Sequence, residues 1–267
     1  QFSLPPLVLH AIHRQDVRTL SLWASSLELP STKTTWFNFL ASHDGIGLNP
    51  LRGILPESDI LSLVEKLQQE GALVNWKNNP DGTRSPYEIN VTYLDALSPK
   101  NAADNERIAR FILAHAVLLS FPGVPAIYIQ SVLGSRNDYE GVERLGYNRA
   151  INRKKYIAGE IDSELSNTTG IRHKIFKQLS KLIAIRRAEQ VFHPDSHALF
   201  ETSGKHILKI IRVAKNGERI TALFNFSQYI QTVNSEGISG TELIAKENIS
   251  GTTLTLNPWQ VMWIKEN

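Results

Sequence analysis

The sequence changes character at His193-Pro194, and this change restricts the folds that the chain can adopt. Before it, apolar residues recur at the three- and four-residue spacing of helices. After it, short β-branched or aromatic runs are separated by Asn-Gly, Glu-Gly and Ser-Gly turns, which is typical of antiparallel hairpins. The predicted strands of this part are residues 207–213, 219–226, 229–233 and 261–264. We therefore expect two domains, residues 1–190 and residues 191–267.

The composition excludes several classes of protein. The 267 residues are 42% apolar and 21% charged, as in globular proteins, and the formal net charge is only +3. No dense Lys/Arg block is interleaved with aromatic residues, so we expect neither a nucleic acid nor a membrane as partner. The chain has no cysteine, which is compatible with the cytoplasm, the predicted location. His10 and His13 are three residues apart, but no acidic partner completes a metal set with them, so we expect ordinary helix residues and no metal site.

The part before His193 alternates between predicted strands and predicted helices. Short apolar runs predict strands at residues 2–4, from Thr35 onward and at 126–129, and helical spacing predicts helices at about residues 5–12, 16–27, 58–71, 105–121 and 172–187. A long excursion covers about residues 45–100. Residues 76–86 within it have the composition of turns. Long excursions of this kind usually carry function.

Residues 35–47, TWFNFLASHDGIG, combine a strand-like run with a polar end. The apolar run leads into His43 and Asp44, which are followed by Gly45 and Gly47. In a parallel α/β barrel the active site lies at the C-terminal ends of the strands, so this pair is a catalytic candidate. The alternative is a β-turn in which Asp44 only accepts backbone hydrogen bonds, as is common for Asp-Gly pairs.

Phe39, His43 and Asp44, in the spacing F-x-x-x-H-D, resemble the fourth signature region of the α-amylase family, glycoside hydrolase family 13. Residues 45–56, GIGLNPLRGILP, resemble its sucrose phosphorylase-like branch. Residues 134–156, GSRNDYEGVERLGYNRAINRKKY, resemble the same branch in an Asn-Asp pair and an I-N-R segment. Several matches in the right order are more specific than any one of them.

This resemblance implies an α/β fold. The chain would form the C-terminal part of a (β/α)8 TIM barrel, with about three of the eight strands, followed by an antiparallel all-β C-terminal domain. The only methionine is Met262 and the chain starts at Gln1, so we expect that a leader was removed or that the chain is a piece of a longer protein. Because an incomplete barrel leaves strand edges unpaired, we expect the chain to fold poorly by itself.

Retaining cleavage of a glycosidic bond needs a carboxylate nucleophile and a carboxylic acid about 5 Å apart. No segment here matches the two family regions that supply them, so we expect both upstream of Gln1. The resemblance assigns to this chain the third catalytic acid, Asp44, which binds sugar hydroxyls and favours ring distortion. It gives His43 a hydrogen bond to the same ring and places Arg153 on the far side of the glucosyl group. The alternative for Arg153 is an ordinary basic residue of a solvated loop.

Residues 87–93, YEINVTY, resemble the acceptor-binding loop of the branch, which makes Tyr87 and Glu88 candidate acceptor-binding residues. Sucrose phosphorylases typically have a glutamine at the position of Glu88, so sucrose itself is in question. We expect an ionised Glu88 to favour neutral polyol acceptors over anionic ones unless Arg84 or Arg52 neutralises it. The alternative is that Glu88 is a surface loop residue.

The resemblance therefore implies an α-retaining glycoside phosphorylase, which transfers a glucosyl group from a glucoside to inorganic phosphate and gives glucose 1-phosphate. It implies no metal ion and no other cofactor. A hydrolase or transglucosylase of the same family would use the same residues, and a non-catalytic carbohydrate-binding or scaffold remnant is the alternative from another class. Without nucleophile and acid, we expect the 267-residue chain alone to be inactive.

Overall fold

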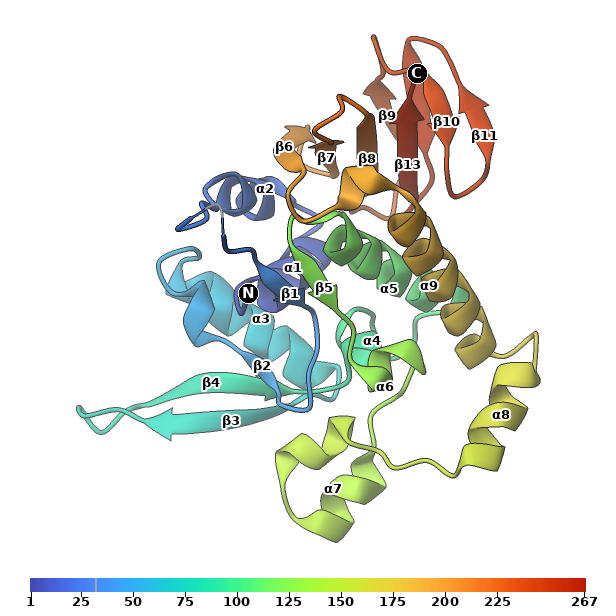
Figure 1. Cartoon of the computed structure of the whole chain (residues 1–267). Coiled ribbons are helices and arrows are strands. Elements are labelled where there is room, and N and C mark those ends of the chain that lie inside the picture. Colours follow the sequence, from blue (N-terminus) through green and yellow to red (C-terminus); the bar gives the residue numbers. More distant parts are fainter. Residues whose placement is uncertain (32) are drawn as a thin grey trace.

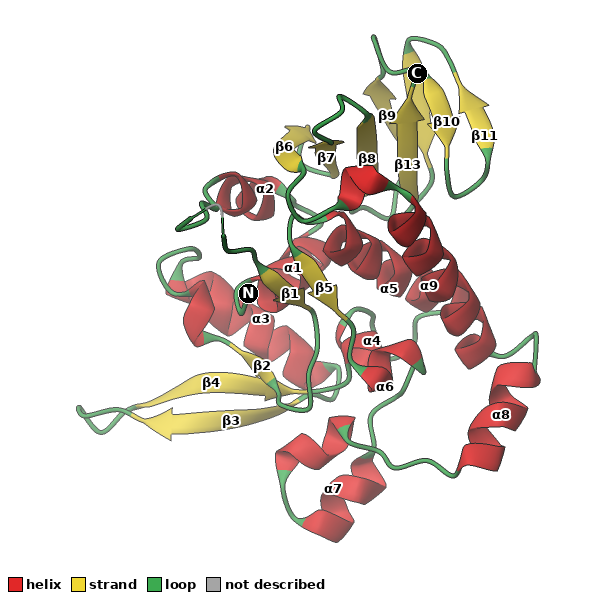
Figure 2. Ribbon diagram, viewed as in Figure 1, coloured by secondary structure: helices red, strands yellow, loops and turns green. Residues whose placement is uncertain are grey.

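The computed structural model describes residues 1–31 and 33–267, in which a helical part is followed by a part built of strands (Figures 1 and 2). The α-helices are α1 (Leu4–Arg14), α2 (Arg18–Ser25), α3 (Glu57–Gln69), α4 (Tyr93–Ala96), α5 (Asp104–Ser120), α6 (Ile129–Val132), α7 (Tyr139–Leu145), α8 (Ala158–Ser166) and α9 (Ile171–Ala188). Short 3₁₀ helices are η1 (Asn49–Leu51), η2 (Asn148–Asn152) and η3 (Gln190–Phe192). The change from helices to strands falls between α9 and residue 197, and the division at residue 190 stays a prediction.

The helical part contains one small parallel sheet of two short strands among the described residues. In Figure 1, β1 (Phe37–Phe39) and β5 (Val124–Ala126) run side by side, and Phe37 is in register with Val124. In the described part of the chain these two strands pair only with each other. Phe37 is 60% exposed and Val124 is 43% exposed, so this small sheet is open to its surroundings.

Two strand predictions are wrong. Residues 2–4 do not form a strand, because Ser3 caps α1 and the helix begins at Leu4 with two prolines in its first turn. The strand predicted at residues 126–129 lies earlier, at Val124–Ala126, and Ile129 begins α6. The described residues therefore contain two parallel strands rather than three. A short apolar run does not by itself distinguish a strand from the end of a helix.

The excursion after β1 contains α3 and a three-stranded antiparallel sheet. Its strands β2 (Ile46–Gly47), β3 (Leu73–Asn78) and β4 (Arg84–Asn90) lie in the order β2-β4-β3. The prediction that residues 76–86 are all turn is wrong, since the turn is confined to the tip, where the Asn79 nitrogen donates to the Thr83 oxygen at 2.8 Å. A register shift opposite Asn75 and Trp76 leaves Tyr87 as a bulge, and such a site tolerates Pro86.

The C-terminal part is antiparallel, as the hairpin pattern predicted. Its strands are β6 (His197–Ser203), β7 (Ile207–Val213), β8 (Arg219–Asn225), β9 (Gln231–Asn234), β10 (Gly240–Glu242), β11 (Glu247–Ile249), β12 (Thr253–Leu256) and β13 (Val261–Glu266). Six of them form one sheet in the order β11-β10-β13-β8-β7-β6, and β12 pairs with β9. Figure 2 shows these strands gathered at one end of the molecule, beyond α5 and α9.

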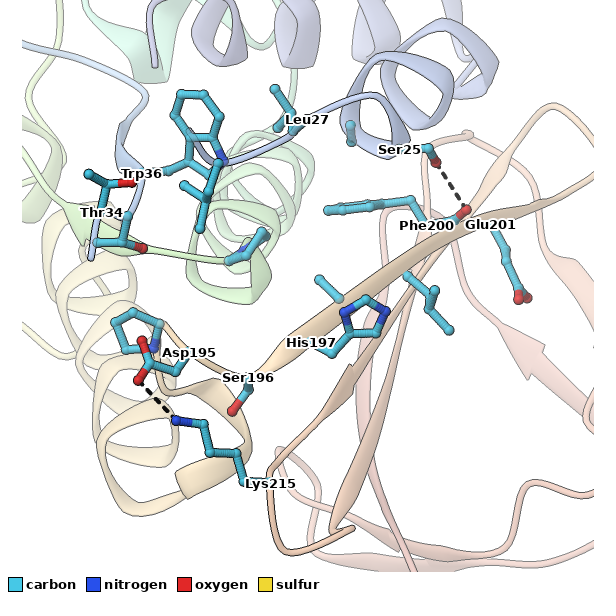
Figure 3. Close-up of a pocket in the computed structure, with 17 residues that line it drawn as sticks. Ser25, Leu27, Thr34, Trp36, Asp195, Ser196, His197, Phe200, Glu201 and Lys215 are labelled. Atoms are coloured by element: carbon cyan, nitrogen blue, oxygen red, sulfur yellow. Dashed lines mark hydrogen bonds and ion pairs between the residues drawn. The ribbon is translucent and has the colours of Figure 1, made fainter. Parts of the chain in front are cut away.

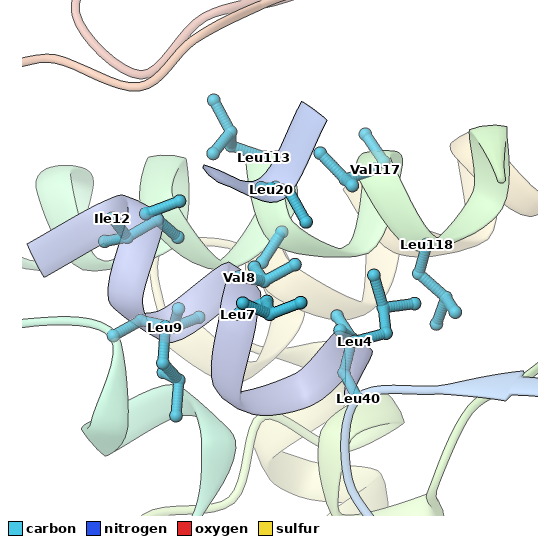
Figure 4. Close-up of a cluster of buried hydrophobic side chains, with 14 of the residues drawn as sticks. Leu4, Leu7, Val8, Leu9, Ile12, Leu20, Leu40, Leu113, Val117 and Leu118 are labelled. Carbon is cyan, nitrogen blue, oxygen red and sulfur yellow. The ribbon is translucent and has the colours of Figure 1, made fainter. Parts of the chain in front are cut away.

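A core between α1 and α5 fixes the position of β1. Figure 4 shows Leu4 and Val8 of α1 pointing into a cluster that includes Leu113 and Val117 of α5, and each of these side chains is at most 1% exposed. Burying one leucine side chain stabilises a fold by about 1.5–3 kcal/mol. Leu40, the residue after β1, is also 1% exposed and belongs to this cluster, so the chain leaves the core just before His43.

No helix in residues 1–31 and 33–267 combines the length and the apolar character needed to cross a membrane.

Candidate functional site

His43 and Asp44 lie in the loop that follows β1, at the strand end where the sequence places them. The side chain of His43 is 69% exposed and that of Asp44 is 42% exposed, and His43 Nε2 lies 3.6 Å from Asp44 Oδ1. Among the described residues no backbone N–H donates to the Asp44 carboxylate, which the β-turn alternative requires. The carboxylate instead projects toward side chains from a distant segment.

Two arginines hold one oxygen of the Asp44 carboxylate. Arg149 in η2 donates from Nη1 to Asp44 Oδ1 at 2.7 Å, and Arg153 donates from Nη2 to the same oxygen at 3.2 Å. Arg153 also donates from Nε to the backbone oxygen of His43 at 2.6 Å. No described residue donates a hydrogen bond to Asp44 Oδ2, so this oxygen is available to a ligand.

Asn152 holds the backbone on both sides of His43. Its Nδ2 donates to the backbone oxygens of Ser42 at 3.1 Å and Asp44 at 3.0 Å. The Tyr128 hydroxyl in turn donates to the backbone oxygen of Asn152 at 3.2 Å. The loop that carries His43 and Asp44 is therefore attached to η2 through main-chain contacts as well as ion pairs.

Glu88 lies in β4 and is only 4% exposed, so the interpretation as a surface loop residue is wrong. Its Oε1 accepts hydrogen bonds from the Gly45 nitrogen at 3.2 Å and from Arg149 Nη2 at 2.9 Å. Its Oε2 accepts from Asn75 Nδ2 at 2.7 Å and from Arg149 Nε at 3.2 Å. Both oxygens of this carboxylate are thus engaged inside the protein.

The residue that neutralises Glu88 is Arg149, and neither Arg84 nor Arg52 takes this role. The hydrogen bond with Glu88, with a smaller contribution from the charge of Asp44, raises the pKa of Arg149 above its ordinary value. Arg52 pairs with Glu57 at 3.3 Å, and Arg84 is exposed at the start of β4. The expectation that the charge of Glu88 repels anionic acceptors is therefore corrected, because that charge is paired and buried.

Tyr87 precedes Glu88 at the bulge of β4. Its backbone oxygen accepts a hydrogen bond from the Leu48 nitrogen at 2.9 Å, and its side chain is half-buried. Tyr87 lies near enough to Arg149 to contribute to the raised pKa of that arginine. Tyr87 therefore lies in the surroundings of Arg149, which contacts Asp44, and its role in acceptor binding stays a prediction.

Sequence reasoning missed four polar residues of the site: Asn75, Asn148, Arg149 and Asn152. Asn148 Nδ2 donates to Asn75 Oδ1 at 2.7 Å, which links η2 to the β3–β4 hairpin. The available signal was the segment NRAINR, in which Arg149 stands four residues before Arg153. That spacing alone does not show which arginine reaches which carboxylate.

The described structure also has a cavity away from this cluster. It has a volume of about 680 Å³ and lies between α2, the segment before β1, and β6. Figure 3 shows Trp36 and Phe200 on its walls and the ion pair between Asp195 and Lys215, 3.3 Å long, at its rim. None of the predicted site residues lines it.

A smaller hollow of about 50 Å³ lies beside Asp44, with Phe39, Ser42 and Tyr93 among its walls. The described residues include no group of three or more His, Cys, Asp or Glu side chains that could hold a metal ion. The site therefore offers one free carboxylate oxygen as acceptor, with guanidinium and imidazole groups next to it. Such a combination suits the neighbouring hydroxyl groups of a sugar, each of which donates and accepts hydrogen bonds.

Comparison with known proteins shows which enzymes the chain resembles. No family model matches the chain. The chain is 64% identical over 265 residues to glucosylglycerate phosphorylase from Escherichia coli, a match that covers 99% of this chain and 47% of that enzyme. The resemblance to the sucrose phosphorylase-like branch is confirmed. Sucrose phosphorylase from Streptococcus mutans is 30% identical over 247 residues, which cover 89% of this chain and 47% of that enzyme.

The fold of the branch is also seen in a solved structure. Sucrose 6F-phosphate phosphorylase from Thermoanaerobacter thermosaccharolyticum matches 94% of this chain and 47% of its own chain, with a TM-score of 0.72 at 23% identity. The chain has the fold of part of a (β/α)8 barrel followed by an antiparallel β domain. It spans about half the length of the curated relatives that it matches.

Proposed function

We propose that this chain forms part of an α-retaining glycoside phosphorylase, which transfers a glucosyl group between a glucoside and inorganic phosphate. The observation that carries the proposal is the contact of Asp44 with Arg149 and Arg153 at the end of β1, beside the exposed His43. Similarity to glucosylglycerate and sucrose phosphorylases supports it. The carboxylate nucleophile and the general acid would come from outside residues 1–267.

In this proposal Asp44 binds two hydroxyls of the glucosyl ring through its free oxygen and favours the distortion that leads to the transition state. His43 donates to the same ring, and Arg153 contacts its far side. These contacts with the glucosyl ring accelerate its transfer only if they are stronger in the transition state than in the bound substrate. Tyr87 contributes to the acceptor side of the site.

We further propose that the acceptor is glycerate or a similar small anionic polyol. Three relatives of this chain are glucosylglycerate phosphorylases, at 64%, 38% and 34% identity. The neutral-acceptor prediction rested on a free Glu88, but Arg149 pairs with this carboxylate inside the protein. The positive charges of Arg149 and Arg153 balance the negative charges of Asp44 and Glu88. These four side chains together carry no net charge, so they do not repel an anionic acceptor.

An assay on a longer protein that contains this sequence tests the proposal. Glucosylglycerate, glucosylglycerol and sucrose are each incubated with and without inorganic phosphate, and glucose 1-phosphate and glucose are measured. We expect phosphate-dependent glucose 1-phosphate, formed fastest from glucosylglycerate. Glucose release independent of phosphate would favour the hydrolase alternative, and no turnover of any glucoside would favour the non-catalytic one.

The remaining expectations stay predictions. A cytoplasmic location is compatible with the absence of cysteine, and the proposed partners are a glucoside and phosphate. The inactivity of the 267-residue chain by itself likewise awaits an assay of the purified chain.

A further inference from the structure

The guanidinium group of Arg149 contacts two carboxylates, that of Glu88 in β4 and that of Asp44 in the loop after β1. The Nε and Nη2 atoms bind the two oxygens of Glu88 at 3.2 and 2.9 Å. The remaining nitrogen, Nη1, donates to Asp44 Oδ1 at 2.7 Å. Because the guanidinium group is planar and rigid, an arginine held at both oxygens of one carboxylate has a fixed direction for its third nitrogen.

Glu88 is itself immobilised. Its side chain is 6% exposed, whereas the side chain of Arg149 is 39% exposed, so the carboxylate is the buried anchor of the pair. Asn75 from the neighbouring strand β3 donates to one oxygen, and the backbone nitrogen of Gly45 donates to the other. Glu88 therefore contacts the residue after Asp44 directly and the Asp44 side chain through Arg149.

We propose that Glu88 and Arg149 act together as a positioning pair that sets the direction of the Asp44 carboxylate. Arg149 is the positioning residue, and Glu88 acts through it without touching the acceptor. This inference rests on the proposed function, in which Asp44 binds the glucosyl ring. Glu88 belongs to the β3–β4 hairpin, which lies in the excursion after β1. Through Arg149 this hairpin sets the direction of the Asp44 side chain, although Asp44 lies 44 positions earlier in the chain than Glu88.

The pair has a second consequence for Asp44. Rotation of the Asp44 carboxylate would move Oδ1 away from both Arg149 and Arg153, so these two contacts hold Oδ2 in one direction. A displacement of about 1 Å at such a group costs on the order of 100-fold in rate. A lysine at position 149 carries its three N–H donors on one nitrogen, so it lacks the planar group whose separate nitrogens reach both oxygens of Glu88 and Asp44 Oδ1.

The test uses an active enzyme that contains this chain, assayed from glucose 1-phosphate with glycerate as acceptor. The variants are Arg149→Lys, Glu88→Gln and the double variant, and Arg144→Lys at an exposed position of α7 is the matched control. We expect each single variant to lower kcat by about 10- to 100-fold. The KM for glucose 1-phosphate should change less than the kcat does, because Asp44 remains present. The double variant should be no slower than the worse single variant, since both changes break the same contact chain.

Three outcomes would overturn the proposal: an unchanged kcat in Arg149→Lys, effects that multiply in the double variant, or a change confined to the KM for glycerate. The last would show that the pair binds the acceptor directly. A buried Glu88 without a charged partner can prevent folding. The variant Glu88→Gln/Arg149→Gln is therefore measured as well, because it removes both charges and leaves no buried charge without a partner. If that variant folds by circular dichroism and keeps the wild-type kcat, the positioning role is excluded.

Failure of the proposed function is distinguishable from failure of this inference. If the wild-type enzyme releases glucose without phosphate, the phosphorylase proposal fails, and the same variants are then assayed for hydrolysis. The positioning pair predicts the same loss of kcat there, because glucosyl transfer to water uses the same Asp44.

Discussion

The backbone nitrogen of Gly45 lies 3.2 Å from Oε1 of Glu88, and a Cβ atom on Gly45 would lie only 2.5 Å from Cγ of the same glutamate. It would also lie 2.7 Å from the backbone oxygen of Ile89. Only glycine therefore allows the loop after Asp44 to pack directly on β4. The Asp-Gly pair that suggested a β-turn is explained by this close approach.

Gly45→Ala is expected to lower kcat by about tenfold or more, because the loop must move away from β4 and takes Asp44 with it. Steady-state kinetics with glucose 1-phosphate and glycerate measure this in an active enzyme that contains the chain. Gly159→Ala in α8 is the control, since nothing lies within 4 Å of its added Cβ. A Gly45→Ala enzyme with wild-type kcat would show that the loop adapts without displacing Asp44.

Asp44→Asn is expected to lower kcat by on the order of 100-fold while changing the KM for glucose 1-phosphate much less. The amide lacks the charge that both Arg149 and Arg153 contact, and bonds that tighten mainly in the transition state appear in kcat. The control is Asp162→Asn at an exposed position of α8. If the only change is a higher KM, Asp44 serves ground-state binding alone.

The sequence predicted elements whose signals are local. The β-branched run of residues 207–213 matches β7 at both ends, and His43 and Asp44 follow β1 as the polar end of that segment predicted. Residues 2–4 and 126–129 do not form the strands that the sequence predicts, because a run of three or four residues carries no periodicity. Their conformations depend on the neighbouring α1 and β5, which are set by tertiary packing.

The environment of Glu88 could not be predicted in the same way. Its exposure depends on Arg149, which lies 61 positions away, and on Asn75 across the hairpin. The motif resemblance assigned Asp44 and Arg153 to the same glucosyl ring, and the structure shows these two residues, 109 positions apart, in contact. No motif pointed to Arg149, because ion pairing between distant segments is a property of the folded arrangement rather than of either segment.

Arg212 links the two parts of the chain and gives a prediction on stability. This residue of β7 is fully buried, and its Nη1 donates to the backbone oxygens of Ser120 and Phe121, both at 3.0 Å, at the end of α5. Its Nη2 donates to the backbone oxygen of His193 at 2.8 Å. Burial lowers the pKa of Arg212 to about 9, which still leaves the guanidinium protonated at neutral pH.

Arg212→Met is expected to reduce the free energy of unfolding by about 3 kcal/mol or more, since several buried carbonyl oxygens lose their donor at about 1–3 kcal/mol each. Urea titrations of wild type and variant measure the change. Arg187→Met at an exposed position of α9 is the control and should shift the value by less than about 0.5 kcal/mol. Equal effects of the two substitutions would contradict a role of Arg212 in joining α5 to the sheet.

His115 makes the stability of the chain sensitive to acid. It is 1% exposed in α5, its Nδ1 lies 2.9 Å from the backbone oxygen of Phe111, and its ring centroid lies 4.0 Å from that of Phe111. Burial lowers the pKa of His115 from 6.5 to about 4. Between these two values the unfolded chain binds a proton that the folded chain does not, so stability is retained above pH 6.5 and is lost as the pH falls toward 4.

The wild type should therefore lose about 2 kcal/mol more of its free energy of unfolding between pH 7.5 and pH 5 than His115→Phe does. Phenylalanine keeps an aromatic ring between Phe111 and Tyr93 and cannot take up a proton. His13, whose pKa burial also lowers to about 4, contributes equally to both proteins and cancels in the comparison. Urea titrations at the two pH values measure the difference, with the exposed His193→Gln as control. Parallel losses in wild type and His115→Phe would mean that His115 is protonated in the folded chain as readily as in the unfolded one.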